Sequence, residues 1–485
     1  MTKRLERGLL LVILAFQVAL GAGYAVGTPA WETPDEPAHY NYIRYVAERA
    51  EFPVMRTGDY DAAELERLKA ARFPAGTSVD GVRYENHQPP LYYALMAPLF
   101  KASAGLPVPQ QVVVLRLASV LLGTLVLLAA YAIARNLFPA NPLMALAVPA
   151  FLAVIPMHTA MSAAINNDTL SELLLAIILF LSLLRLQDRL PARRYVLLAG
   201  LVYGLGLLTK ITVYVGAGVY AGAELGRWWL ARGGRSTAQN RRALLNGLVS
   251  LSGVGAVGLA LGGWWFVRNA LVYGNLDILA RQRHDLVVVG QPRTVWGLDA
   301  LQHFATTTFH SFWAQFGWMG IPVDQRIYHA LAVLTAMAGA GLVLYLVHRF
   351  PGLDPVQKWG LGLAALLFAF IFGGMAQYNL DYIQPQGRYL FPAAVAVALA
   401  FVLGLEELAG RALCTLLLAG GVAWLALQGA GRMPTGLGVS AVLLLAGVRW
   451  RAPRAAAPVL VTGALVALTA LDVYCLVGVV APYLR

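Results

Sequence analysis

The chain has 485 residues, of which 59% are hydrophobic and only 13% are charged. This charged share is about half that of a typical soluble domain, and a soluble fold of this length could not hide so much apolar surface. The composition excludes a water-soluble multidomain protein, and it excludes a disordered chain because disorder requires low hydrophobicity. The remaining class is an all-α polytopic membrane protein, since long apolar runs are present and the alternating pattern of membrane strands is absent.

The chain carries 37 basic and 25 acidic residues, which gives a net charge of +12. Basic residues collect in the short cytoplasmic loops of membrane proteins, so we attribute this excess to topology and expect no nucleic-acid partner. The two cysteines, Cys414 and Cys475, lie in separate apolar stretches. Neither a disulfide framework nor a metal-binding spacing follows from them.

The first apolar run, at about residues 8–26, follows three basic residues and is long enough to span a membrane. A signal peptide can begin in the same way, but the rest of the chain is also apolar, so we predict an uncleaved first helix with its N-terminus inside. The polar segment 28–88 then lies outside. We expect interfacial helices in this first outer loop, one beginning near Pro37 and one of about a dozen residues after Pro89 and Pro90.

Regular apolar runs follow the first outer segment. They lie at about residues 112–135, 141–160, 165–186, 195–230, 243–267, 327–348, 357–377, 388–405, 411–430, 434–449 and 457–482. Basic loops follow the runs that end near residues 186, 230, 348 and 449, and these loops are expected inside. Because both ends of 195–230 are basic, this stretch is predicted to hold two short helices that turn near Lys210 at the outer face. The total is about 13 transmembrane helices, with a second outer segment at 268–325.

Polar side chains interrupt the apolar pattern at the outer ends of these runs. They include Asp35, Glu36, His39, His87, Arg116, Asn167, Asp168, Lys210, Arg268, Arg388 and Tyr389. Ionisable groups close to the membrane core are costly and often mark a functional site, although polar ends of outer loops would explain any one of them. The positive-inside rule disfavours cations on this face. The grouping of Lys210, Arg268 and Arg388 therefore indicates an anion held there, such as a lipid phosphate or pyrophosphate.

The adjacent carboxylates of Asp35 and Glu36 form the sharpest motif. They lie between Pro34 and Pro37 directly after the first helix, and each proline favours extended or turn geometry at the residue before it. A carboxylate in this place could accept a proton from a sugar hydroxyl or ligate a divalent cation. A capping aspartate at the start of a helix near Pro37 explains the same residues in purely structural terms.

Several motifs in order along the chain resemble the GT-C glycosyltransferases, which include the protein O-mannosyltransferases and the lipid A aminoarabinose transferases. The motifs are Asp35-Glu36, His87-Gln-Pro-Pro-Leu-Tyr-Tyr93, Arg116-Leu-Ala-Ser119, Asn166-Asn-Asp-Thr169, Leu208-Thr-Lys210, Trp264-Trp-Phe-Val-Arg-Asn269 and Gln386-Gly-Arg-Tyr-Leu-Phe-Pro392. The resemblance covers about residues 8–392. It implies a GT-C-like transmembrane catalytic module at 1–405, with outer loops at 28–111 and 268–325, followed by C-terminal transmembrane helices at 406–485.

The resemblance implies an inverting membrane glycosyltransferase at the outer face of a bacterial plasma membrane, embedded among membrane lipids. A sugar would move from a polyprenyl-phosphate donor to a hydroxyl of a lipid, glycan or protein acceptor, with Asp35 as the general base and Glu36 beside it. The donor phosphate would be held by Lys210, Arg268, Arg388 and Arg116. Substrate contacts would come from His39, His87, Asn167, Asp168 and Tyr389, although helix capping explains Asn167 and Asp168 equally well. Some relatives use a divalent cation, for which Asp35 and Glu36 would be the ligands.

Two other functions fit parts of the pattern. A transporter or flippase of lipid-linked sugars would also bind a lipid phosphate, but it would favour inverted repeats and polar sites near the membrane midplane. A ligase or polymerase that uses a lipid-pyrophosphate donor would share the outer cations, but its large polar loop typically lies later in the chain. The glycosyltransferase interpretation agrees best with the early position of the long outer loop.

Overall fold

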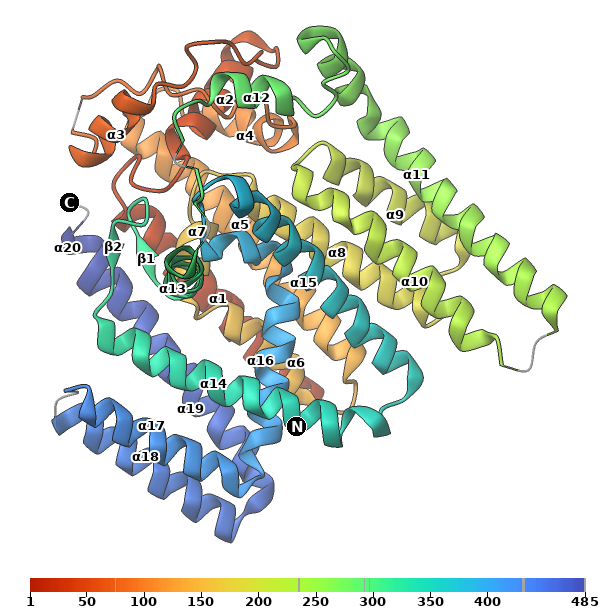
Figure 1. Cartoon of the computed structure of the whole chain (residues 1–485), viewed down its shortest axis with the longest axis vertical. Coiled ribbons are helices and arrows are strands. Elements are labelled where there is room, and N and C mark those ends of the chain that lie inside the picture. Colours follow the sequence, from red (N-terminus) through yellow and green to blue (C-terminus); the bar gives the residue numbers. More distant parts are fainter. Residues whose placement is uncertain (75, 234–235, 292, 296, 430–431, 484–485) are drawn as a thin grey trace.

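A computed structural model describes residues 1–485 except 75, 234–235, 292, 296, 430–431 and 484–485, and the described chain is mostly helical (Figure 1). Strands within these residues are limited to one antiparallel pair, β1 (Gln315–Phe316) and β2 (Ile321–Pro322). Eight of the described helices are long and apolar enough to cross a membrane, or up to nine if one bent pair counts as a single span. The predicted class of all-α, multi-pass membrane protein is therefore confirmed.

The long helices form the bundle at the predicted apolar runs. They are α1 (Lys3–Gly27), α5 (Val108–Leu137), α8 (Asp168–Leu186), α11 (Thr237–Tyr273), α14 (Gln325–His348) and α15 (Pro355–Asp381). Two further spans are composite. One joins η3 (Gly387–Ala393) to α16 (Ala394–Ala409), and the other joins η4 (Pro453–Ala455), α19 (Ala456–Tyr474), η5 (Cys475–Val480) and α20 (Ala481–Tyr483).

The run predicted as one helix at 141–160 is instead a bent pair. It consists of α6 (Pro142–Leu152) and α7 (Pro156–Ser162), whose axes differ by 67°. Pro156 begins α7, and a proline cannot donate the backbone hydrogen bond that would continue α6. The bend therefore follows from a proline inside an apolar run, a signal that hydropathy alone does not register.

Four shorter or less apolar helices occupy the remaining predicted positions. They are α9 (Ala192–Leu207), α10 (Gly216–Ala231), α17 (Ala412–Leu427) and α18 (Arg432–Arg451). The predicted turn near Lys210 is present, since this residue lies between α9 and the short helix η1 (Ile211–Val215), which leads into α10. These four helices are too short or insufficiently apolar to be counted as membrane spans by length and hydropathy. The count of about 13 transmembrane helices therefore stays a prediction.

The helices of the first outer segment lie together at the top of Figure 1, and the beginning of the second outer segment lies beside them. The first contains α2 (Glu36–Arg49), α3 (Ala62–Ala70) and α4 (Leu91–Ala102), and α2 and α4 begin where the prolines predicted. The second contains α12 (Arg281–Val287) and α13 (Leu298–Trp313), which were not predicted. The segments meet where the rings of His87 and His284 lie with centroids 4.6 Å apart.

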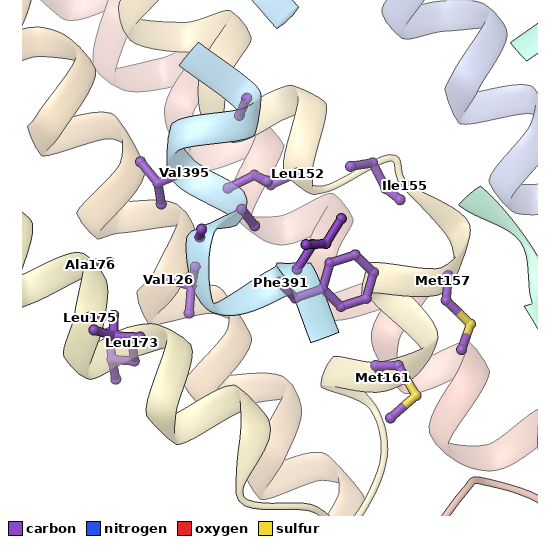
Figure 2. Packing of buried hydrophobic residues seen from close by; sticks show 14 of the residues in the cluster. Val126, Leu152, Ile155, Met157, Met161, Leu173, Leu175, Ala176, Phe391 and Val395 are labelled. Atoms are coloured by element: carbon purple, nitrogen blue, oxygen red, sulfur yellow. The ribbon is translucent and has the colours of Figure 1, made fainter. Parts of the chain in front are cut away.

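The apolar core lies directly below these outer segments. Figure 2 shows its side chains, which come from α5, α6, α7, α8 and the η3–α16 segment. The ring of Phe391 in η3 is buried there, 5.5 Å from the ring of Phe312 and 5.1 Å from the ring of His158. Since Phe391 follows Arg388 by one helical turn, the packing of this ring fixes the place where the Arg388 side chain begins.

Candidate active site

Asp35 lies after the C-terminal end of α1, in the cap position before α2. Its backbone has φ of 66°, which is a left-handed conformation that non-glycine residues rarely adopt. Such strain persists only where the surrounding structure enforces it, and it often accompanies function. The Asp35 carboxylate accepts hydrogen bonds from the Tyr84 hydroxyl at 2.8 Å and from Arg388 Nη2 at 2.6 Å. Its side chain keeps 25% of its surface exposed.

A second ion pair lies in the same cluster. Lys210 Nζ donates to Asp168 Oδ1 at 2.6 Å, and both side chains remain about a fifth exposed, at 17% and 21%. The charges of Asp168 and Lys210 act on the Arg388 guanidinium and on the His39 ring, which places the two pairs close together. Four segments far apart in sequence thus contribute two carboxylates and two cations to one partly open site.

Tight packing positions Arg388. Gly387 lies so close to α13 that an added Cβ would come within 2.3 Å of Thr308 O, and its backbone N–H donates to Ser311 Oγ at 2.7 Å. Only glycine fits this contact, which holds η3 against α13. Arg388 Nε then donates to Gln386 Oε1 at 2.6 Å, so the guanidinium is directed by two acceptors.

The ends of α8 and α9 position the other pair. Asn166 caps α8, because its Oδ1 accepts from the backbone N–H groups of Asp168 at 3.0 Å and Thr169 at 3.3 Å. Asn167 is fully buried and its amide donates to the Thr209 carbonyl at 3.2 Å, which ties the start of α8 to the residue before Lys210. Asn167 therefore joins two parts of the site, and the predicted capping role belongs to Asn166.

The electrostatics of the outer residues follow from this packing. Burial alone would raise the pKa of the Asp35 carboxyl, but the Arg388 guanidinium outweighs it and holds that pKa below its ordinary value. Burial lowers the pKa of His39, whose Nδ1 lies 2.9 Å from the Tyr93 hydroxyl. Burial and the nearby His284 lower the pKa of His87 to about 3. At neutral pH, Asp35 is thus ionised and the two histidines are uncharged.

Glu36 and Arg116 do not occupy the places that the predicted roles require. They form an ion pair at 2.6 Å, and their side chains are 0% and 1% exposed. Arg116 also donates to the carbonyl oxygens of Ala25 at 3.0 Å and Pro29 at 2.9 Å. A guanidinium whose donors are all engaged inside the protein cannot receive a lipid phosphate. We therefore correct the prediction and assign this pair to the framework that shapes the loop before Asp35.

Arg268 lies near the C-terminal end of α11. Its guanidinium donates to the backbone carbonyls of Pro53 at 2.6 Å and Phe52 at 3.3 Å and lies over the ring of Trp265. These contacts hold the first outer loop against the end of α11, and no carboxylate within the described chain pairs with Arg268. Of the remaining predicted residues, Tyr389 lies half-buried under the Arg388 guanidinium, 5.2 Å from its ring centroid.

Sequence reasoning missed several residues of the site. Tyr84 donates to Asp35, and Tyr93 contacts His39. Glu85 exerts its charge on both His39 and Lys210, and its Oε2 is buried without a hydrogen-bond partner among the described residues. Tyr84 and Glu85 lie three and two residues before His87, where the predicted motif begins, so their closeness to that motif is the signal that could have found them.

The described residues do not fit the metal site considered for Asp35 and Glu36. Both carboxylate oxygens of Glu36 accept from Arg116, and Asp35 is bound to Arg388 and Tyr84. Within the described ranges, no group of three or more histidine, cysteine, aspartate or glutamate side chains is arranged to hold a metal ion. No step through a metal follows from this site.

Known proteins resemble this chain in part of its sequence and in its fold. Residues 87–257 match the model of the dolichyl-phosphate-mannose-protein mannosyltransferase family. ArnT from Cupriavidus metallidurans has a similar fold in its complex with undecaprenyl phosphate, with a TM-score of 0.53 and 16% identity over 97% of this chain and 78% of that chain. Its apo state gives the same TM-score and coverage with 17% identity.

An oligosaccharyltransferase from Archaeoglobus fulgidus in its apo form is similar at a lower TM-score of 0.48, with 16% identity over 95% of this chain and 56% of that chain. No curated protein sequence matches the chain. The family match of residues 87–257 and the fold shared with ArnT agree with the resemblance to the GT-C glycosyltransferases that the motifs indicated.

Proposed function

We propose that this glycosyltransferase moves a sugar from a polyprenyl-phosphate donor to an acceptor hydroxyl in a single, inverting displacement. The observation that carries the proposal is the convergence of Asp35, Asp168, Lys210 and Arg388 in one partly exposed cluster. Two cations beside a carboxylate that is open to solvent are the groups that phosphate binding and proton transfer require. The undecaprenyl phosphate bound to ArnT, a protein of the same fold, supports a lipid-phosphate donor.

Lys210 and Arg388 hold the donor phosphate in this mechanism. Their N–H groups stabilise the negative charge that gathers on the phosphate as the bond to the sugar breaks. Arg268, whose contacts hold the first outer loop, keeps its predicted role as a third cation for the phosphate. Arg116 has no part in this step, because its donors are engaged by Glu36 and by backbone carbonyls.

Asp35 acts as the general base. The acceptor oxygen attacks the anomeric carbon, the bond from that carbon to the phosphate oxygen breaks, and the hydroxyl proton passes to Asp35. Polyprenyl phosphate leaves, and a single displacement inverts the anomeric configuration. Tyr84 keeps the carboxylate oriented by donating to Oδ1, which leaves Oδ2 as the oxygen that Arg388 now contacts.

The proposed topology has the N-terminus in the bacterial cytoplasm and the cluster at the outer face. The basic residues of the loops after α8 and α10 favour this orientation under the positive-inside rule. Asp168 begins α8 and Lys210 follows α9, so both lie at the opposite ends of these helices from the basic loops. Reporter fusions after residues 210 and 232 should report opposite sides of the membrane, and a shared side would overturn the topology.

The direct test is sugar transfer by the purified protein from a radiolabelled polyprenyl-phosphate sugar to mixed cell-envelope acceptors. Asp35→Asn should lower the transfer rate by about 10²–10⁴, the usual contribution of a general base. Asp381→Asn is the matched control, because Asp381 is exposed at the same outer junction as Arg388 and has no role in the mechanism. Unchanged transfer in Asp35→Asn would remove Asp35 as the base, and movement of the lipid across vesicles without transfer would favour a transporter.

A further inference from the structure

The two cations assigned to the donor phosphate are both already paired with carboxylates. Arg388 Nη2 lies 2.6 Å from Asp35 Oδ2, and Lys210 Nζ lies 2.6 Å from Asp168 Oδ1. These are the ion pairs that Arg388 and Lys210 form within the described part of the chain. The quartet is electrically balanced, with two positive and two negative side chains.

A phosphate oxygen and a carboxylate oxygen compete for the same donors. Both form short, charge-assisted hydrogen bonds with lysine and arginine. An arriving phosphate would also meet Glu85, a third carboxylate whose charge reaches Lys210. Simple addition would leave the cluster with excess negative charge in a partly buried site, which is costly. Exchange of partners avoids that cost.

We propose that the donor phosphate enters by ion exchange, displacing Asp168 from Lys210 and Asp35 from Arg388. This inference rests on the proposed function and deepens it. Asp168 is then a positioning residue that holds Lys210 ready and competes with the phosphate, in place of the substrate contact predicted from its motif. Asp35 becomes an effective base only when the phosphate has taken Arg388, so donor binding precedes activation of the acceptor hydroxyl.

Both carboxylates that the phosphate would displace lie at the N-terminal ends of helices. Asp168 lies in the first turn of α8, and Asp35 occupies the cap position before α2. The helix dipole favours negative charge at helix N-termini, so neither carboxylate loses all stabilisation when its cation leaves. Tyr84 continues to donate to Asp35 Oδ1, which keeps the base in place after the exchange.

The test measures binding of polyprenyl phosphate without a sugar to the full-length protein in lipid nanodiscs. Asp168→Asn should tighten binding about tenfold, or about 1.4 kcal/mol, because it removes a competitor of the phosphate. Lys210→Gln should weaken binding. In the double variant Asp168→Asn with Lys210→Gln, the gain should disappear, since Asp168 acts only through Lys210. Asp35→Asn should also tighten binding, through Arg388, and serves if Asp168→Asn folds poorly.

Glu85→Gln is the matched control for general charge. Its carboxylate acts on Lys210 but forms no ion pair within the described chain, so its removal should change affinity much less than that of Asp168. Weaker or unchanged binding in Asp168→Asn would overturn the exchange. An equal gain in Glu85→Gln, or a gain that persists without Lys210, would also overturn it. Wild-type protein that does not bind polyprenyl phosphate would instead refute the proposed function.

Discussion

Asp35 and Glu36 are neighbours in sequence, and each pairs with an arginine from a distant segment, yet the two pairs differ in kind. The Glu36–Arg116 pair is 0% and 1% exposed and is surrounded by backbone carbonyls that take the remaining donors. In the Asp35–Arg388 pair the arginine is also buried, at 5% exposed, but Asp35 is 25% exposed. A buried pair with every donor engaged can only hold structure, whereas a pair with an open face can exchange partners. Solvent exposure and unoccupied hydrogen-bonding positions, more than charge, therefore distinguish the structural Glu36–Arg116 pair from the Asp35–Arg388 pair of the candidate active site.

The largest expected effect follows from breaking the buried Glu36–Arg116 ion pair. Arg116→Met should destabilise the protein by about 3–5 kcal/mol, because it leaves Glu36 buried without a partner charge. The measurement is thermal unfolding in detergent, followed by a thiol-reactive dye at the buried cysteines. Arg388→Met is the matched variant at the second pair and should be destabilised much less, because the Asp35 carboxylate that it leaves is 25% exposed and still accepts from Tyr84. Equal destabilisation of both variants would contradict the distinction between the two pairs.

A smaller effect is expected for Arg388→Lys, which keeps the positive charge but replaces the planar guanidinium with an ammonium group. Lysine at position 388 cannot contact Gln386 and Asp35 together as the planar guanidinium does, so the barrier to transfer should rise by about 1–3 kcal/mol, which slows transfer roughly 5- to 150-fold. Steady-state transfer kinetics at varied donor concentration provide the measurement. The unfolding temperature should stay close to that of the wild type. Full transfer activity in this variant would show that positive charge alone suffices at position 388.

The smallest effect concerns Glu32, the third acidic residue of the same segment. It is buried, its Oε1 has no hydrogen-bond partner among the described residues, and burial raises its pKa to about 7. A raised pKa means that the contribution of Glu32 to stability is complete below about pH 4.5 and is lost as the pH rises through 7. The unfolding temperature of the wild type should therefore fall between pH 5 and pH 8 more steeply than that of Glu32→Gln.

Glu51→Gln is the control for this pH dependence, because Glu51 is exposed at the end of α2. It should follow the wild-type curve. If Glu32→Gln and the wild type lose stability in parallel between pH 5 and pH 8, Glu32 is not the titrating group. The acidic residues of this segment would then have only two roles, the structural role of Glu36 and the role of Asp35 as the base.

Much of the fold was predictable because it depends on local pattern. Uninterrupted apolar runs predicted the long helices, a lysine within a run predicted the turn at Lys210, and Pro89-Pro90 predicted the start of α4. The bend between α6 and α7 and the helix α13 were missed, since the first depends on one proline and the second on packing against η3. The division into a catalytic module at 1–405 and C-terminal helices at 406–485 stays a prediction.

The site divides in the same way. The sequence by itself determined that the chain is a membrane protein and that it resembles the GT-C superfamily, because hydropathy and motifs depend on neighbours along the chain. It also grouped Asp35, Asp168, Lys210 and Arg388 on one face, and that this face is the outer one stays a prediction. Only the tertiary structure decided that Arg116 and Glu36 neutralise each other in the interior and that Tyr84 and Gln386 orient the exposed pair. Arg116 lies 80 residues from Glu36, and Arg388 lies 353 residues from Asp35, so neither pairing leaves a signal in the local sequence. Whether a charged side chain has a structural or a catalytic role depends on the partner that the fold brings to it.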